Sequence, residues 1–251
     1  GESKQRSDWN MCMLRDVLAP LYAELLKSAI KTTGGREPEM HCKDFLGLLP
    51  CPSPDQPWSV LTEKLFEHIR KESLLWSSVG NGGRVPMDAA YLLANDVNEH
   101  GLDDAGRDRL ERLLLFHSIP VVTLSKTMQT TLVESKAVAA AISPESVRLL
   151  FSEQNPKSIS TPVDGLTIED IAFLLQYCVS DIPQATPHTA LHGVRLVPLE
   201  NGGMGTFKDA SAEPLYFAGE LERAILGGST ASLVARDELL GSALVGFLRS
   251  G

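Results

Sequence analysis

Two glycine-rich turns, each set between apolar runs, constrain the fold of this chain more than any other feature. Residues 74–93 read LLWSSVGNGGRVPMDAAYLL and residues 194–217 read VRLVPLENGGMGTFKDASAEPLYF. Both hold an apolar run, an Asn-Gly-Gly turn, a short apolar strand, an acidic residue and a second apolar run. Asn followed by Gly tolerates the positive φ angles of a tight hairpin turn. Asn81 and Asn201 therefore predict two antiparallel hairpins, one in each half of the chain.

Helical patterns surround both hairpins. Apolar residues recur with a helical period between Leu14 and Ile30, and Pro20 inside this stripe predicts a kink or two abutting helices. Further patterns and capping residues predict helices over 59–73, 103–116, 126–136, from Ser143, from Thr167, over 220–226 and near 247, with a short buried strand over 119–122. We therefore expect an α+β fold, mostly helical, with two small antiparallel hairpin-based sheets. The expected subdomains are residues 1–136 and 137–251.

Composition and charge exclude several classes of partner. The chain has 251 residues, of which 43% are hydrophobic, so it can build one or two ordinary cores. Its 32 acidic and 23 basic residues give a net charge of −9, which repels the phosphates of nucleic acid. The most apolar stretch, 231–248, is interrupted by charged residues, so no membrane span is predicted. Nucleic acid and membrane are therefore not expected partners.

The cysteines and the N-terminal residues predict a cytoplasmic protein. Its 4 cysteines are widely spaced without a CxxC pair, which indicates free thiols in a reducing compartment. Residues 1–12 lack the basic-then-apolar plan of a secretory signal and suggest a cut within a longer protein. The alternative of a zinc site at His41, Cys42 and Cys51 lacks a fourth ligand.

The glycine-rich loops and the polar side chains supply little chemistry. A loop that cradles phosphate normally opens a helix, whereas strand-like residues follow Gly82 and Gly202, so both are interpreted as hairpin turns. His117 with Ser118 is the only adjacent pair that suggests nucleophilic catalysis, and His117 is better explained as a helix-terminal histidine. No catalytic residue, metal or cofactor site is therefore predicted. Arg84, beside the first turn, remains a candidate phosphate sensor for a neighbouring domain, against the alternative of a solvated surface arginine.

A set of ordered segments resembles the large internal repeat of sacsin and its plant and algal relatives. The resemblance covers residues 9–240 and is carried by WNMCMLRDVLAPLYAELL, LLWSSVGNGGRVPMDAAYL, IPVVTLSKTMQTTL, ISPESVRLLF, LLQYCVSDI, LVPLENGGMGTF and LYFAGELERAILGG. In that family each repeat begins with an ATP-binding domain of the GHKL class. The resemblance implies that this chain follows such a domain, which binds ATP outside it. The glycine boxes and the acidic residue of that class have no counterpart here.

The resemblance implies a chaperone-related role in proteostasis. The expected partners are neighbouring domains of the same polypeptide, client proteins and Hsp70-type chaperones. We expect a non-catalytic structural and interaction module that relays the state of the ATP-binding domain or offers a surface to clients. Two alternatives stay open at this point. One is a middle-domain-like accessory segment that contributes to ATP hydrolysis through Arg84, and the other is an ATP-independent scaffold or adaptor.

Overall fold

The structure is a computed structural model that describes most of the chain up to residue 207. The described residues are 2–32, 47–50, 58–77, 83–94, 100–138, 140–152, 166–182, 190–199 and 204–207. The chain divides into two compact units. Unit 1 comprises Gly1–Asn98 and Asp103–Ile142, and unit 2 comprises Glu99–Leu102 and Ser143–Gly251. The helices expected over 220–226 and near 247 lie outside the described residues.

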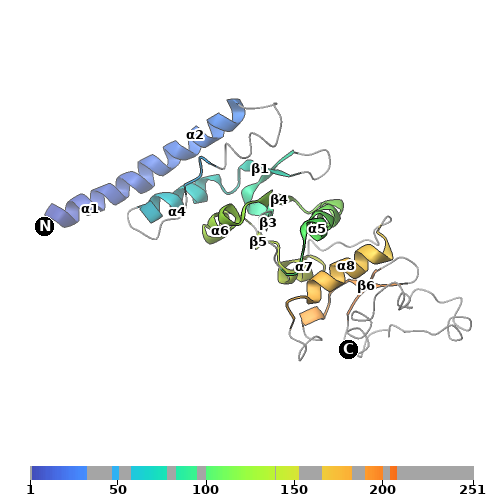
Figure 1. The fold of residues 1–251 in the computed structure, drawn as a ribbon. Helices are drawn as coiled ribbons and strands as arrows, with labels where there is room; N and C mark the ends of the chain where they lie inside the picture. The colour runs from blue at the N-terminus through green and yellow to red at the C-terminus, as the bar shows by residue number, and fades with distance from the viewer. Residues whose placement is uncertain are drawn as a thin grey trace, which may run out of the picture. The chain divides into compact units, whose positions relative to one another are not determined.

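Unit 1 begins with one long helix, drawn in blue in Figure 1. It consists of α1 (Glu2–Met13), a π-helical turn (Leu14–Leu18) and α2 (Ala19–Thr32). In the π turn the amide of Ala19 donates to the carbonyl of Leu14, five residues back, and both flanking residues keep helical dihedral angles. Pro20 would clash with a carbonyl four residues back in α geometry, and the wider turn relieves that clash. A continuous helix with a π turn thus replaces the kink or the paired helices that Pro20 predicted.

The inner face of α2 packs on α4 (Trp58–Ile69). Small residues at Ala19 and Ala23 face the large side chains of Leu65 and Phe66, and all of these side chains are buried in one core cluster. A salt bridge of 2.9 Å joins Lys27 of α2 to Glu72, just beyond α4. The sequence predicted a longer second helix, to residue 73. It ends earlier because the chain turns at residues 70–72 and enters the first strand.

The first predicted hairpin is present. Strand β1 (Ser73–Ser77) pairs antiparallel with β2 (Gly83–Pro86), and the register places Trp76 opposite Arg84. A short 3-10 turn (Met87–Ala89) then leads to the next strand. The turn residues Asn81 and Gly82 lie outside the described residues, so the structure bears on the strands of this hairpin and not on its turn.

A three-stranded parallel sheet, which the sequence did not predict, forms the rest of unit 1. Its strands are β3 (Tyr91–Ala94), β4 (Val121–Leu124) and β5 (Ala140–Ala141), in the order β4-β3-β5. Helix α5 (Asp104–Phe116) connects β3 to β4, and α6 (Lys126–Glu134) connects β4 to β5. Because β5 pairs with β3, unit 1 extends beyond residue 136, where the sequence placed the boundary.

Polar side chains fix both connecting helices of this sheet. Asp103 caps α5 by accepting from the amide of Gly106 at 2.8 Å. Inside α6, the buried Gln129 donates its side-chain amide to the carbonyl of Leu92 on the central strand, at 3.0 Å. The helix is thereby tied to the sheet by a hydrogen bond that few side chains can provide.

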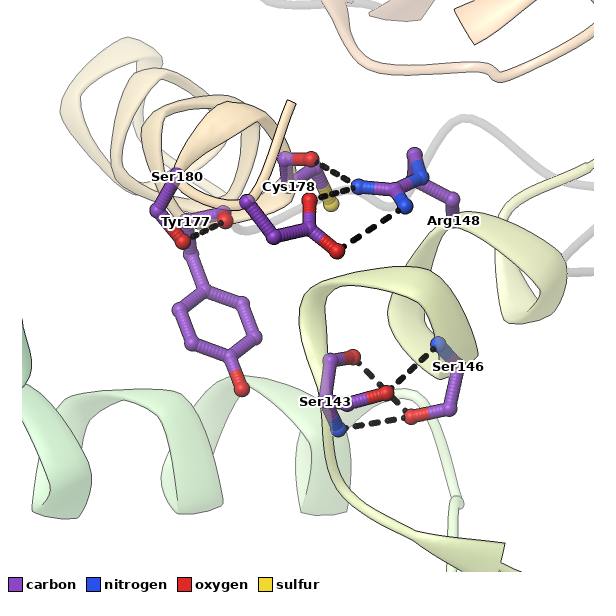
Figure 2. A network of polar contacts seen from close by, with 7 residues as sticks. Ser143, Ser146, Arg148, Tyr177, Cys178 and Ser180 are labelled. Atoms are coloured by element: carbon purple, nitrogen blue, oxygen red, sulfur yellow. Dashed lines mark hydrogen bonds and ion pairs between the residues drawn. The ribbon is translucent and has the colours of Figure 1, made fainter. Parts of the chain in front are cut away.

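Unit 2 contains α7 (Pro144–Leu150), α8 (Ile168–Val179) and the strand pair β6 (Val197–Pro198) and β7 (Met204–Gly205). Ser143 caps α7 in a reciprocal capping box with Ser146, as Figure 2 shows, and Thr167 caps α8. The β6 and β7 pairing is the second predicted hairpin, although Asn201 and Gly202 again lie outside the described residues. The core of this unit includes the buried apolar residues Val147, Leu150, Phe151, Ile171, Leu174, Leu175, Leu191, Val194, Leu196 and Val197.

The predicted α+β class is confirmed, with one antiparallel hairpin in each half and a parallel sheet in addition. None of the helices in the described residues combines the length and the apolar character that crossing a bilayer requires.

Candidate functional site

Arg84 lies on the hairpin strand β2 and not in the turn. Leu75 and its cross-strand partner Val85 belong to the core side of the hairpin. Side chains alternate along a strand, so Arg84 and its partner Trp76 lie on the opposite face. Both side chains are half-buried. Residues directly opposite in an antiparallel pair have Cβ atoms about 5 Å apart, so Trp76 and Arg84 are cross-strand neighbours.

Within the ranges that the structure describes, no carboxylate forms an ion pair with Arg84. A guanidinium on a paired strand offers a planar fork of donors that suits phosphate or carboxylate oxygens. The predicted hairpin-turn residues Asn81, Gly82, Asn201 and Gly202 lie outside the described residues.

The second notable surface is the outer face of the N-terminal helix. We define this outer leucine face as Val17, Leu18, Leu21 and Leu25, with exposed fractions of 38%, 44%, 62% and 62%. The opposite side of the same helix is buried on α4. The sequence predicted one helical apolar stripe that included all four residues. The apolar residues at positions 17, 18, 21, 25, 26, 29 and 30 cover more than one face of a helix. This wide apolar surface was the sequence signal that part of it would stay exposed.

The charged residues beside the outer leucine face are largely paired with each other. Arg15 and Asp16 form an ion pair of 2.7 Å, and Lys27 reaches Glu24 at 3.1 Å. The hydrogen bonds from Arg15, and then the one from Cys12, lower the pKa of Asp16 to about 2. The face is therefore apolar and close to neutral at its margins.

Unit 2 holds a polar clip that joins α7 to α8 (Figure 2). The guanidinium of Arg148 on α7 donates to the backbone carbonyl of Cys178 at the end of α8 and forms a two-pronged ion pair with Asp181, at 2.5 and 3.1 Å. The Arg148 side chain is only 12% exposed. Burial raises the pKa of the Cys178 thiol, which keeps it protonated and poorly nucleophilic. This cluster stabilises the unit and supplies no reactive group.

His117 closes the C-terminal end of α5. Its ring lies edge-on to Phe116, with 5.6 Å between the ring centres. Burial lowers the pKa of His117 to about 4, so the imidazole is neutral at pH 7. The sequence interpretation attributed this histidine to attraction between an imidazolium and the helix dipole. That attraction is small for a neutral ring, and packing is the better explanation of its position.

The described ranges also contain no place where three or more His, Cys, Asp or Glu side chains come together as metal ligands would. Cys12 is exposed and Cys178 buried, while Cys42 and Cys51 lie outside these ranges.

Comparison with known proteins assigns no family to this chain. No family model, no curated protein and no solved structure matches it. The function proposed below therefore depends on the geometry of the described residues and on the resemblance seen in the sequence.

Proposed function

We propose that this chain is a non-catalytic interaction module of a sacsin-like, chaperone-related cytoplasmic protein, placed after an ATP-binding domain. The outer leucine face is the observation that carries this proposal. Its four large apolar side chains lie on one helix whose other side is already packed on α4. Single exposed leucines are ordinary on protein surfaces, whereas a contiguous group on one helix face is typical of a binding surface.

The free energy gained by covering apolar side chains supports binding through this face. Covering one leucine or valine side chain contributes roughly 1.5–3 kcal/mol relative to leaving it in water. Leu18, Leu21 and Leu25 have the i, i+3, i+7 spacing by which a helix presents anchors to a groove or to another helix. Such a surface fits a neighbouring domain or the exposed apolar segments of a client.

The test is a holding assay with the whole chain. We expect the wild type to suppress light scattering by a thermally unfolding reporter enzyme such as citrate synthase. The double substitution Leu21→Glu and Leu25→Glu should abolish that suppression because it charges the centre of the face. Asn10→Glu, at an exposed polar position of the same helix, is the matched control and should hold as well as the wild type. Equal holding by the double variant would contradict the proposal.

The half-buried Arg84 favours a second candidate function, a middle-domain-like contribution to ATP hydrolysis by the upstream domain. The test measures ATP turnover of that domain fused to this chain. An arginine that reaches the transferred phosphate contributes roughly a thousandfold or more to turnover, so Arg84→Ala should lower it by at least tenfold. Arg70→Ala, which removes an exposed arginine of the same unit, is the control. Unchanged turnover in Arg84→Ala eliminates this candidate.

The nucleotide dependence of holding separates the remaining alternative. Holding that changes when the fused upstream domain is given ATP supports a relay of nucleotide state. If the fusion protein holds the reporter equally well with and without ATP, the chain is instead an ATP-independent scaffold.

A further inference from the structure

Four leucines of the N-terminal helix have the spacing of a single helix face, but they lie on two different sides of the helix. Leu14, Leu18, Leu21 and Leu25 are separated by four, three and four residues, which places them on a single face of an uninterrupted α-helix. In the structure Leu14 is only 7% exposed, whereas the other three are 44%, 62% and 62% exposed. The π turn between them accounts for this division, because one extra residue rotates the following helix by roughly 100°.

We propose that the N-terminal helix has two packing registers and that the π turn converts one into the other. In the observed register the turn is π-helical and α2 presents Ala19, Ala23, Leu26 and Ile30 to α4. In the second register the turn is α-helical and the chain beyond it is advanced by one residue. In that register α4 is faced by Leu18 in place of Ala19, by Tyr22 in place of Ala23, by Leu25 in place of Leu26 and by Ala29 in place of Ile30.

Both registers offer α4 an apolar face, and named contacts hold the observed one. The Tyr22 hydroxyl donates to the carbonyl of Leu48, and Lys27 bridges to Glu72 at 2.9 Å. Pro20 favours the same register, since its ring would oppose the carbonyl of Asp16 in an α-helical turn. The second register regains regular α geometry and turns Leu18 and Leu25 inward.

The switch would regulate the outer leucine face, and this consequence rests on the proposed interaction function. In the observed register the leucines are available to a partner. In the second register Leu18 and Leu25 cover α4 and the binding surface is withdrawn. A partner that binds only the outward leucines shifts the equilibrium toward the π-helical turn.

The register can be read without any partner, by the reactivity of single thiols toward a maleimide. The probes are Leu25→Cys and Leu26→Cys in a Cys12→Ser background, with labelling resolved by peptide mass spectrometry. Leu25 is 62% exposed and Leu26 is 0% exposed, so the probe at position 25 should react much faster in the observed register. Pro20→Ala removes the bias toward the π turn. We expect it to slow labelling at position 25 and to speed labelling at position 26, each by tenfold or more.

A second comparison keeps Pro20 and does not depend on how well that variant folds. Leu65→Cys places a probe on α4 that both registers cover, and Leu65, like Leu26, is 0% exposed. If the register changes in the native protein, position 26 should label at least tenfold faster than position 65. Equal rates at positions 26 and 65 would mean that only unfolding exposes them, and they would overturn the proposal. So would unchanged rates, or rates raised at both positions 25 and 26, in Pro20→Ala. These results would leave the holding assay untouched, so the two proposals fail separately.

Discussion

Arg148 connects α7 to the C-terminal end of α8 through one guanidinium group. Replacing it with methionine keeps the apolar stem but leaves the Cys178 carbonyl and Asp181 without the donors they have now. Removing a charged donor so that a buried acceptor has no hydrogen-bond partner costs about 1–3 kcal/mol. Arg148→Met should therefore lower the free energy of unfolding by that amount. Urea unfolding measures it.

The control for this prediction is Arg148→Lys. Lysine keeps the charge but cannot place two donors in a fixed fork, so an intermediate loss is expected. Equal stability of Arg148→Met and the wild type would show that the clip does not stabilise unit 2.

His117 should make stability depend on pH in a defined window. Its pKa falls from 6.5 to about 4 in the folded protein, because burial disfavours the imidazolium. Between these two pKa values the unfolded chain binds a proton at His117 that the folded chain does not bind. The contribution of His117 to the free energy of unfolding is therefore fully present above about pH 6.5 and is lost as the pH falls toward 4. A pKa difference corresponds to about 1.4 kcal/mol per unit. Because the ring keeps partial access to solvent, we expect the free energy of unfolding to fall by about 1–3 kcal/mol. Chemical unfolding at several pH values checks this.

His117→Gln is the comparison that isolates this residue, since carboxylates also titrate near pH 4. The difference in unfolding free energy between the wild type and His117→Gln should shrink or reverse between pH 6.5 and 4. A difference that stays constant over this window would show that His117 does not carry the effect.

Among the elements, the π turn gives an unusual expectation for a deletion. Removing one residue from a helix normally rotates everything beyond it by roughly 100° and exposes its buried face. Deleting Val17 together with Pro20→Ala should instead convert the π turn to an α turn and keep both Leu14 and the Ala19 face on α4. We expect a helical protein within about 1–2 kcal/mol of the wild type in thermal or urea unfolding.

Deletion of Glu24 is the matched control, because it lies in regular α helix on the exposed side. It should rotate Leu26 out of the core and cost about 2–5 kcal/mol. If both deletions destabilise the protein equally, the π turn does not act as a one-residue insertion.

Elements fixed by local chemistry were predictable, and those fixed by distant contacts were not. The caps at Ser143 and Thr167 and the strands beside the Asn-Gly turns follow from neighbouring residues, and the structure contains them. The parallel sheet was missed because β3 and β5 are short and pair across more than 40 residues of chain, where a local pattern carries no signal. Arg84 stays a predicted site residue, and its position opposite Trp76 required the strand register. The outer leucine face was not predicted, because the apolar positions between residues 17 and 30 are wide enough for two helix faces and periodicity alone does not show which face is buried.

At the scale of the whole molecule, each unit has its own buried core and should respond to core mutations separately. Leu65→Ala truncates a buried side chain of unit 1 and Leu174→Ala one of unit 2, each at a cost of about 2–5 kcal/mol. Hydrogen exchange can report on both through two bonded amides, Ile142 in unit 1 and Arg195 in unit 2. Leu65→Ala should speed exchange at Ile142 and Leu174→Ala at Arg195. If either substitution speeds both amides equally, the units unfold as one.

Residues 99–102 belong to unit 2, although in the sequence they precede strands β4 and β5 of the parallel sheet of unit 1. His100 in this segment lies edge-on to Tyr177 of α8, with 6.1 Å between the ring centres. On the ribosome, α5, β4, α6 and β5 are all translated between these two contact partners, so the first can meet the second only after the strands of that sheet have emerged. A gene split between codons 142 and 143 would therefore deliver a second fragment that lacks one of its own aromatic contacts.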